Sequence, residues 1–329
     1  MDGKLPVIRL KDSRKGNMKF IDLFAGVGGF RYGLTKANKK FKCVWSNEWN
    51  TYANSVYRHR FGSCDDNDIR TVPAGSIPDH ELLCAGFPCQ SFSIAGKRRG
   101  FDDTRGTLFF DIARILKEKR PRLCLLENVK GLLSHDDGRT IKTIFTTLVE
   151  LGYDLQWQVL NSKDFGVPQN RERIFIIGNL RNTPRPEVFP FGESDGTPIP
   201  ASARSEGEGK RVRRQDISAA IDANYYKGQG STRQMIEMTQ GVSDAQRVYD
   251  PKGIAKTLTL TGQDIHGVSD GIRIRRLTPI ETERLQGFPD NWTQYGVNGE
   301  LISDSQRYRM TGNAVSTPVI EAIGRRLLW

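Results

Sequence analysis

The sequence predicts an α/β protein with a doubly wound, mostly parallel sheet and a second, smaller, loop-rich domain. Between residues 18 and 180, short apolar runs alternate with stretches of helical periodicity. This alternation is typical of a parallel sheet that is covered by helices on both faces. After residue 182 the texture changes, because prolines crowd residues 184–200 and a Gly-, Ser- and Glu-rich stretch follows. Such a composition indicates a loop or linker that leads into a different domain.

The strands expected in the first part of the chain are apolar runs of four to six residues. They lie at residues 19–24, 42–46, 82–85, 123–126 and 173–177. Helices are expected where apolar residues recur every three or four positions. These positions are Phe30, Leu34 and Ala37; Leu108, Ile112, Ile115 and Leu116; and Ile141, Ile144, Phe145 and Leu148. A last helix, at residues 318–328, should pack back on the first domain.

Charge and cysteine content narrow the class of protein. The formal net charge is +11 over 329 residues, which favours a polyanionic partner, although a merely basic enzyme is the alternative. The five cysteines are odd in number and form no CxxC pair, so we expect neither a disulfide framework nor a metal site, and we expect a reducing compartment. Cys43, Cys84 and Cys124 lie in strand-like runs and should be core residues. We find neither a membrane span nor a signal peptide.

Cys89 is the first candidate for chemistry. It lies in the segment 86–91, Gly-Phe-Pro-Cys-Gln-Ser, directly after the strand-like run 82–85. Ligands of open α/β sheets bind at the carboxyl ends of the strands, and Pro88 restricts the backbone beside the thiol. A cysteine acts as a nucleophile when its surroundings favour the thiolate. A structural cysteine in a turn is the alternative.

A glycine-rich turn at residues 26–29, between the first strand and the first helix, is the second candidate. Glycines let a ligand approach the backbone, and the helix N-terminus favours polar groups. Glu48 ends the second strand, where an acid can bind ribose hydroxyls. Trp49 can stack on adenine, and Asp68 can accept from an adenine amino group. The turn lacks the G-x-G-x-x-G pattern, which favours S-adenosylmethionine over a nicotinamide cofactor; a tight turn with solvated acids is the alternative.

Seven short sequence motifs, in their order along the chain, resemble those of the DNA cytosine-5 methyltransferases. The length of the chain and the spacing of the motifs resemble those of the small bacterial HhaI-type enzymes of restriction-modification systems. The segments that carry the resemblance are residues 22–29, 86–91, 127–129, 169–173, 276–278, 283–289 and 312–315. The resemblance runs from residue 18 to the C-terminus, and it is interrupted at residues 182–275. It implies a Rossmann-like, S-adenosylmethionine-dependent methyltransferase fold.

The resemblance assigns roles to individual residues. Cys89 is the nucleophile that adds to C6 of cytosine, and Glu127 contacts N3 and the exocyclic amine. Arg173 holds O2 of the base, and Arg171 supports the thiolate and its loop electrostatically. The cofactor is S-adenosylmethionine, and its expected contacts are Phe24, Gly26, Gly28, Gly29, Glu48, Trp49, Asp68, Ile69, Pro88, Leu108 and Asn313. For the arginines, a surface ion pair with Glu172 is the alternative.

The resemblance also implies double-stranded DNA as the partner, with the target base flipped out of the duplex. The expected DNA contacts are Ser91, Ser93, Ala95, Lys97, Arg98, Arg99, Arg213, Arg214, Ser243, Asp244 and Gln246. Two positions depart from the HhaI-type pattern. Ala95 stands where a serine reaches into the gap left by the flipped base, and Asp244 stands where a glutamine is usual, with Gln246 close by.

The resemblance implies three regions: residues 1–181 for catalysis and cofactor binding, 182–303 for a small domain with target recognition at about 182–275, and 304–329 for a segment returning to the first domain. We expect a monomeric cytoplasmic enzyme, encoded by a bacterium, archaeon or phage, with a cognate endonuclease as a further partner. The alternatives are a tRNA methyltransferase, a catalytically idle DNA-binding relative and a dinucleotide-dependent oxidoreductase. No cysteine follows Cys124, which disfavours the tRNA enzyme.

Overall fold

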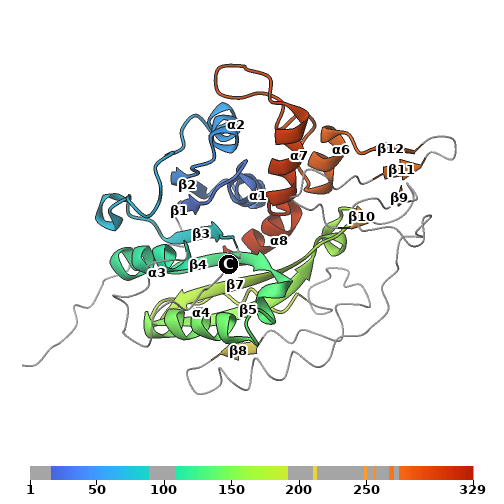
Figure 1. The fold of residues 1–329 in the computed structure, drawn as a ribbon. Coiled ribbons are helices and arrows are strands. Elements are labelled where there is room, and N and C mark those ends of the chain that lie inside the picture. The colour runs from blue at the N-terminus through green and yellow to red at the C-terminus, as the bar shows by residue number, and fades with distance from the viewer. Residues whose placement is uncertain are drawn as a thin grey trace, which may run out of the picture.

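The computed structural model describes residues 16–88, 108–191 and 277–328, together with five short strands between residues 210 and 276. A seven-stranded sheet in the order β2-β1-β3-β4-β7-β5-β8 forms its centre (Figure 1). Its strands are β1 (Met18–Leu23), β2 (Phe41–Asn47), β3 (Leu82–Gly86), β4 (Leu123–Val129), β5 (Tyr153–Asn161), β7 (Glu172–Leu180) and β8 (Lys210–Val212). The expected α/β sheet is confirmed.

The first four strands of the sheet run parallel, and the rest pair in the antiparallel sense. β1 pairs with β2 and β3, and β3 pairs with β4, all parallel. β7 lies between β4 and β5 and is antiparallel to both. The beginning of β7 therefore lies beside the end of β4, where Arg173 is opposite Val129. This reversal brings residues from both strands to one edge of the sheet.

Helices cover both faces of the sheet, as Figure 1 shows for α1 and α8 on one side and α3 and α4 on the other. They are α1 (Gly29–Ala37), α2 (Thr51–Phe61), α3 (Leu108–Lys119), α4 (Arg139–Glu150), α6 (Pro279–Leu285), α7 (Asp304–Asn313) and α8 (Thr317–Leu327). Short 3₁₀ turns are η2 (Ala74–Ser76), η4 (Lys130–Leu133) and η5 (Ser162–Phe165). The expected C-terminal helix packs on α1.

Side chains of the strands alternate between two cores. Ile21, Leu83 and Leu126 lie in the core beneath α3 and α4, whereas Phe20 and Leu125 lie in the core beneath α1 and α8. Because successive side chains of a strand point to opposite faces, strands covered on both sides are apolar along their whole length. This is why the parallel strands appear as continuous apolar runs in the sequence.

A third core joins the glycine turn and α2 to the C-terminal part of the chain. It contains Val27, Ala53 and Val56, and across from them Phe288, Trp292, Ile302, Met310 and Ala314. The indole nitrogen of Trp292 donates to the carbonyl of Val27 at 2.9 Å. Residues 288–302 are thus packed on the first domain, and the division of the chain at residues 182 and 303 stays a prediction.

After β7, residues 184–191 run back along β5. Hydrogen bonds from side chains of β5, and not backbone pairing between strands, hold them there. The Gln156 amide oxygen accepts from the backbone N–H of Val188 at 3.0 Å, and that of Gln158 accepts from Phe191 at 3.0 Å. Arg326 of α8 donates to the carbonyls of Val188 and Pro190. We call residues 184–191 the return segment. Its end, Phe191, contacts Phe165 of η5, with ring centroids 5.5 Å apart.

The short strands in the later part of the chain form small sheets. β10 (Ala255–Lys256) pairs with β6 (Gln169–Asn170), and β11 (Gly267–Ser269) pairs with β9 (Val248–Tyr249) and β12 (Ile274–Arg276). Residues 210–214 are rich in lysine and arginine. The first three of them form β8, which joins the main sheet by pairing with β5 instead of forming a small sheet.

Candidate active site

The carboxyl ends of the parallel strands meet at one edge of the sheet, and the predicted site residues follow them. In the register, Leu23 lies beside both Asn47 and Ala85, and Gly86 lies beside Glu127. Phe24 and Glu48 follow directly on β1 and β2, and Pro88 lies two residues after the end of β3. Residues that are far apart in the sequence are thereby collected at the edge where open α/β sheets bind ligands.

Glu127 and Arg173 form a largely buried ion pair across β4 and β7. Arg173 Nε lies 3.2 Å from Glu127 Oε1, and the two side chains are 13% and 12% exposed. Glu127 faces Phe175 in the antiparallel register, so that Arg173 is its diagonal neighbour on the same face. Burial raises the pKa of Glu127, although Arg173 and Arg171 oppose the rise. The carboxyl thus holds a proton to a higher pH than an ordinary glutamate and can act as an acid.

The backbone leading to Cys89 is fixed against this pair. A Cβ built on Gly86 would lie 3.3 Å from Glu127 Oε2, so the carboxylate rests over the backbone three residues before the cysteine. The amide nitrogen of Asn128 donates to the carbonyl of Phe87 at 2.8 Å. Phe87 is buried, whereas Pro88 is exposed. The segment therefore leaves the sheet beside Glu127.

The four other cysteines are unsuited to nucleophilic chemistry. Cys84 and Cys124 are fully buried, as expected, and Cys43 is half-buried on β2. Burial raises the pKa of Cys43 to about 11 and that of Cys64 and Cys124 to about 12, and it raises the pKa of Cys84 well above its ordinary value. A thiol that stays protonated is a poor nucleophile. Of the five cysteines, this leaves Cys89 as the candidate.

The glycine turn binds Glu48 through its backbone. The N–H of Gly26 donates to Glu48 Oε2 at 2.8 Å, and the N–H of Asn50 donates to Glu48 Oε1 at 2.8 Å. Gly26 has φ +54° and faces open space, whereas a Cβ on Gly28, at φ +87°, would lie 2.3 Å from the Phe61 ring. Gly26 thus leaves room for a ligand, and Gly28 permits the close packing of the turn on α2.

The other predicted cofactor residues lie around this turn with different exposures. Trp49 is 67% exposed, and Phe24 is half-buried with φ +54°. Asp68 is held by Arg70, whose Nε donates to both carboxylate oxygens at 2.9 Å, and this contact lowers the pKa of Asp68. The Ile69 side chain is buried in the core, and its carbonyl accepts from Arg114 Nη2 at 2.9 Å. Leu108 begins α3, and Asn313 ends α7 with an exposed side chain.

Comparison with known proteins identifies the family to which the chain belongs. The profile of the family described as C-5 cytosine-specific DNA methylase matches residues 18–329. The chain belongs to this family. It is a DNA cytosine-5 methyltransferase with the resemblance and the fold that the sequence predicted, and its membership rules out the oxidoreductase alternative.

Several proteins are similar to this methyltransferase over nearly the whole chain. It is 40% identical to the Type II methyltransferase M.HhaI of Haemophilus parahaemolyticus, covering 96% of each chain. It is 41% identical to M.HaeII of Haemophilus aegyptius, covering 94% of this chain and 92% of the relative. A solved S. pombe Dnmt2 methyltransferase shares the fold with TM-score 0.66 and 20% identity, covering 95% of this chain and 98% of that one.

Several of the residues predicted from the sequence lie outside the part of the methyltransferase that the structure describes. They are the nucleophile candidate Cys89 and all of the expected DNA contacts, from Ser91 to Arg99, Arg213, Arg214, Ser243, Asp244 and Gln246. Among the described residues, no group of His, Cys, Asp or Glu is arranged to hold a metal ion. No helix among them is long and apolar enough to cross a membrane.

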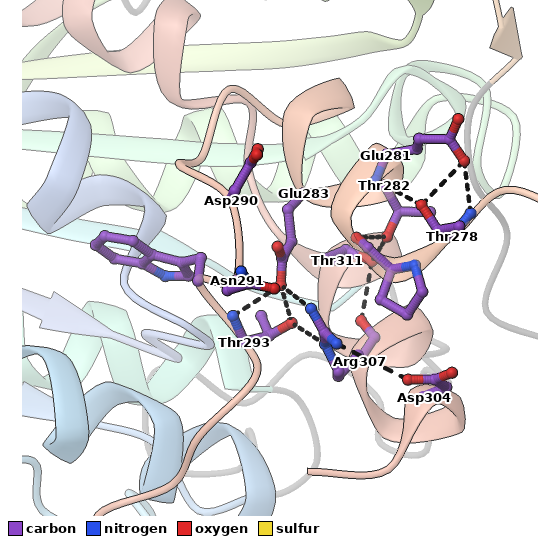
Figure 2. A network of polar contacts seen from close by, with 12 residues as sticks. Thr278, Glu281, Thr282, Glu283, Asp290, Asn291, Thr293, Asp304, Arg307 and Thr311 are labelled. Atoms are coloured by element: carbon purple, nitrogen blue, oxygen red, sulfur yellow. Dashed lines mark hydrogen bonds and ion pairs between the residues drawn. The ribbon is translucent and has the colours of Figure 1, made fainter. Parts of the chain in front are cut away.

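The sequence did not reveal the polar network that holds α7 against α6. Figure 2 shows Glu283, Thr293 and Arg307 pointing toward one another. Glu283 Oε1 accepts from the Thr293 N–H at 2.8 Å and from Arg307 at 3.0 Å, and Glu283 is fully buried. Thr311 donates to Thr282 at 3.0 Å one turn further along α7. The network therefore positions the end of the helix that carries Asn313.

Arg171 and Gln169 are buried, although the sequence suggested a surface ion pair with Glu172 as an alternative for the arginines. Arg171 is 2% exposed, and Gln169 accepts a hydrogen bond from the Gln286 amide at 2.9 Å. Glu172 instead binds Lys130, with 3.1 Å between Nζ and Oε1. The surface-pair alternative is therefore wrong for Arg171 and Arg173.

Proposed function

We propose that this methyltransferase transfers a methyl group from S-adenosylmethionine to C5 of a cytosine that is flipped out of a specific double-stranded DNA sequence. The observation that carries the proposal is the Glu127–Arg173 pair, held at 3.2 Å beside the backbone that leads to Cys89. A carboxyl whose pKa is raised by burial, beside a guanidinium, suits the N3 and O2 edge of cytosine.

Cys89 supplies the nucleophile in this proposal. C5 of cytosine is too electron-poor to take a methyl group unaided. When the Cys89 thiolate forms a bond to C6, the C5–C6 π electrons become available at C5, and Glu127 gives a proton to N3. C5 then takes the methyl group, which S-adenosylmethionine supplies with loss of its sulfonium charge. Loss of the proton from C5 to a base or to solvent, release of the thiolate and return of the N3 proton to Glu127 restore the aromatic ring and the acid.

The residues around the glycine turn fit S-adenosylmethionine. Gly26 faces open space, so that the ligand can approach the backbone. Each Glu48 oxygen receives one backbone N–H, which leaves further lone pairs for ribose hydroxyls. The exposed Trp49 offers a stacking surface for adenine. Asn313, Pro88 and Leu108 complete the proposed contacts from the other elements.

The partners and setting follow from the same proposal. The net charge of +11 supports DNA as the polyanion, with Lys97 to Arg99 and Arg213–Arg214 as phosphate contacts and residues 182–275 as the reader of the sequence. Type II relatives support a cognate endonuclease for the same site. We propose a monomeric enzyme of the cytoplasm.

Covalent trapping tests the nucleophile. The protein should form a denaturation-resistant adduct with duplex DNA that carries 5-fluorocytosine at the target, because fluorine cannot leave C5 as a proton does. Cys89→Ser should form none, whereas the matched control Cys64→Ser should form it fully. An adduct in Cys89→Ser would refute the mechanism. Bisulfite sequencing of DNA from expressing cells identifies the methylated sequence, and methylation of tRNA alone would favour the other branch of the family.

Calorimetry tests the cofactor site. Trp49→Ala should weaken S-adenosylmethionine binding by roughly 1–3 kcal/mol, the range of an aromatic stacking contact. Tyr52→Ala, which removes another exposed ring at the start of α2, is the control and should bind as the unaltered protein does. Unchanged affinity in Trp49→Ala would remove Trp49 from the site.

A further inference from the structure

The side chain of Arg171 connects the start of β7 to the end of α7. Its Nη2 donates to the carbonyl of Gly312 at 3.1 Å and to the carbonyl of Ala314 at 2.8 Å. These two residues flank Asn313, which is exposed while both of its neighbours are buried. One guanidinium nitrogen thus fixes the backbone on either side of a single outward-facing side chain.

The backbone of Arg171 is also fixed by hydrogen bonds. Its backbone N–H donates to Asn161 Oδ1 at 3.0 Å, and its carbonyl accepts from the Ser162 N–H at 3.0 Å. On the other side, the turn after α7 is tied to α6, where the carbonyl of Gln286 accepts from the Thr317 N–H at 2.9 Å. The turn therefore has two anchors, one on α6 and one on the sheet through Arg171.

The chemistry of this contact favours an arginine. Carbonyls at the end of a helix carry partial negative charge and lack partners within the helix. A guanidinium can neutralise the partial charge of these carbonyls, but burial disfavours its own positive charge. Burial, together with the neighbouring Arg173, lowers the pKa of Arg171 to about 9. Its Nε and Nη1 are buried without a hydrogen-bond partner among the described residues. Glu127 is close enough to act on it electrostatically.

We propose that Arg171 is a positioning residue for the cofactor. It presents Asn313 to S-adenosylmethionine by holding the carbonyls on both sides of it. Since the same guanidinium lies within the field of Glu127, Arg171 links the cofactor side of the site to the base side. The proposal rests on the proposed function, because the contact of Asn313 with the cofactor belongs to that proposal.

Calorimetry without DNA measures this role apart from chemistry. Arg171→Gln should weaken binding of S-adenosylmethionine and of its demethylated product about tenfold, the equivalent of ~1.4 kcal/mol. Arg171→Lys keeps a cation that can reach the carbonyls and should recover most of the affinity. Arg173→Gln is the matched control on the same strand, and it should change cofactor affinity less than about twofold, since Arg173 pairs with Glu127 instead.

A double-mutant cycle with Asn313→Ala shows whether the effect passes through Asn313. In that background Arg171→Gln should cost less than about threefold, because residues that act as a unit are not additive. A full tenfold loss there, or unchanged affinity in Arg171→Gln, would overturn the proposal. If Arg171→Gln lowers the melting temperature too far for calorimetry, Arg171→Lys decides alone: it should bind the cofactor within about threefold of the unaltered protein, and a tenfold loss in the folded variant would overturn the proposal. Failure of the unaltered protein to bind would refute the proposed cofactor site itself.

Discussion

Two carboxylate–arginine pairs in this methyltransferase, one buried and one largely buried, differ in what surrounds them. Glu283 is fully enclosed, and a single oxygen receives the Thr293 N–H, the Thr293 hydroxyl and Arg307. Glu127 has Arg173 as its partner among the described residues, and both of their side chains keep about an eighth of their surface exposed, 12% and 13%. The first pair is closed by the protein, whereas the second keeps hydrogen-bonding capacity for a ligand.

The difference shows that a carboxylate–arginine pair can serve either to hold helices together or to bind and protonate a ligand. A buried ion pair contributes little net stability but is costly to break, because the remaining charge is left without a partner. The Glu283 pair therefore fixes how α6 and α7 meet. The Glu127–Arg173 pair lies at the end of β4. Burial there raises the pKa of the Glu127 carboxyl, which favours a role in giving and taking protons.

The largest expected effect is that of Glu127→Gln on catalysis. Removing the acid should lower kcat by roughly 10²- to 10⁴-fold, the range for a general acid. The melting temperature should fall only modestly, because the glutamine amide oxygen can still accept from Arg173, whose side chain is 13% exposed. Single-turnover methylation and thermal unfolding measure the two quantities. A large loss of stability with retained activity would make this pair a structural one like that of Glu283.

The pH dependence of kcat sharpens this test. Because burial raises the pKa of Glu127, the protonated form persists to higher pH and is lost as the pH rises through that pKa. The unaltered enzyme should therefore lose activity on the alkaline side, and Glu127→Gln should lack this fall. The same alkaline fall in both enzymes would assign the titration to another group.

Breaking the other pair should act on stability. Arg307→Met leaves Glu283 buried without its cation and should cost about 3–5 kcal/mol of unfolding free energy. Adding Glu283→Gln removes the stranded charge while its amide oxygen still accepts from Thr293. The double variant should recover most of the loss. Chemical denaturation measures this, and a double variant as unstable as Arg307→Met would show that packing, not charge, holds the helices.

The smallest expected effect concerns Asp22, a fully buried carboxyl that forms no side-chain hydrogen bond among the described residues and whose charge Arg31 offsets only in part. Burial raises the pKa of Asp22 well above its ordinary value. The folded state then favours the protonated form, so the carboxyl contributes stability at low pH that is lost as the pH rises through the folded pKa. Asp22→Asn should be the more stable protein at pH 8, with the advantage vanishing near pH 4. An advantage that is independent of pH would refute this.

Much of the fold was predictable because the strands covered on both faces are apolar throughout. β1 to β4, α1, α3, α4 and α8 follow from their apolar residues. β5 was missed, since Gln156 and Gln158 interrupt its pattern; both are buried, and their amides bind the backbone of the return segment. α7 was missed as well, because it buries Arg307 and Thr311 rather than an apolar stripe. These polar residues are stable inside only because of partners distant in sequence.

The site was predictable where a residue ends a strand. Glu127 and Arg173 lie together as expected, because β4 and β7 are neighbours. The role of Arg171 was predicted as electrostatic support of the thiolate, yet its hydrogen bonds run to the end of α7. No pattern in the sequence around residue 171 points to a partner 141 residues away. Such a contact follows only from the way the C-terminal helices fold back on the sheet.

The return segment has a consequence for how the chain tolerates change in length. Leu180 ends β7 at the far edge of the sheet, and residues 184–191 bring the chain back to Phe165 beside the end of β5. The chain is anchored again at Leu277, whose carbonyl accepts from the Tyr308 hydroxyl at 2.6 Å. Both ends of the intervening 85 residues, 192–276, are thus fastened to the catalytic body. Since each doubling of a tethered length costs only about 0.6 kcal/mol, we expect insertions between these two ends to cost little, provided that β8 and β10 keep their pairing with β5 and β6.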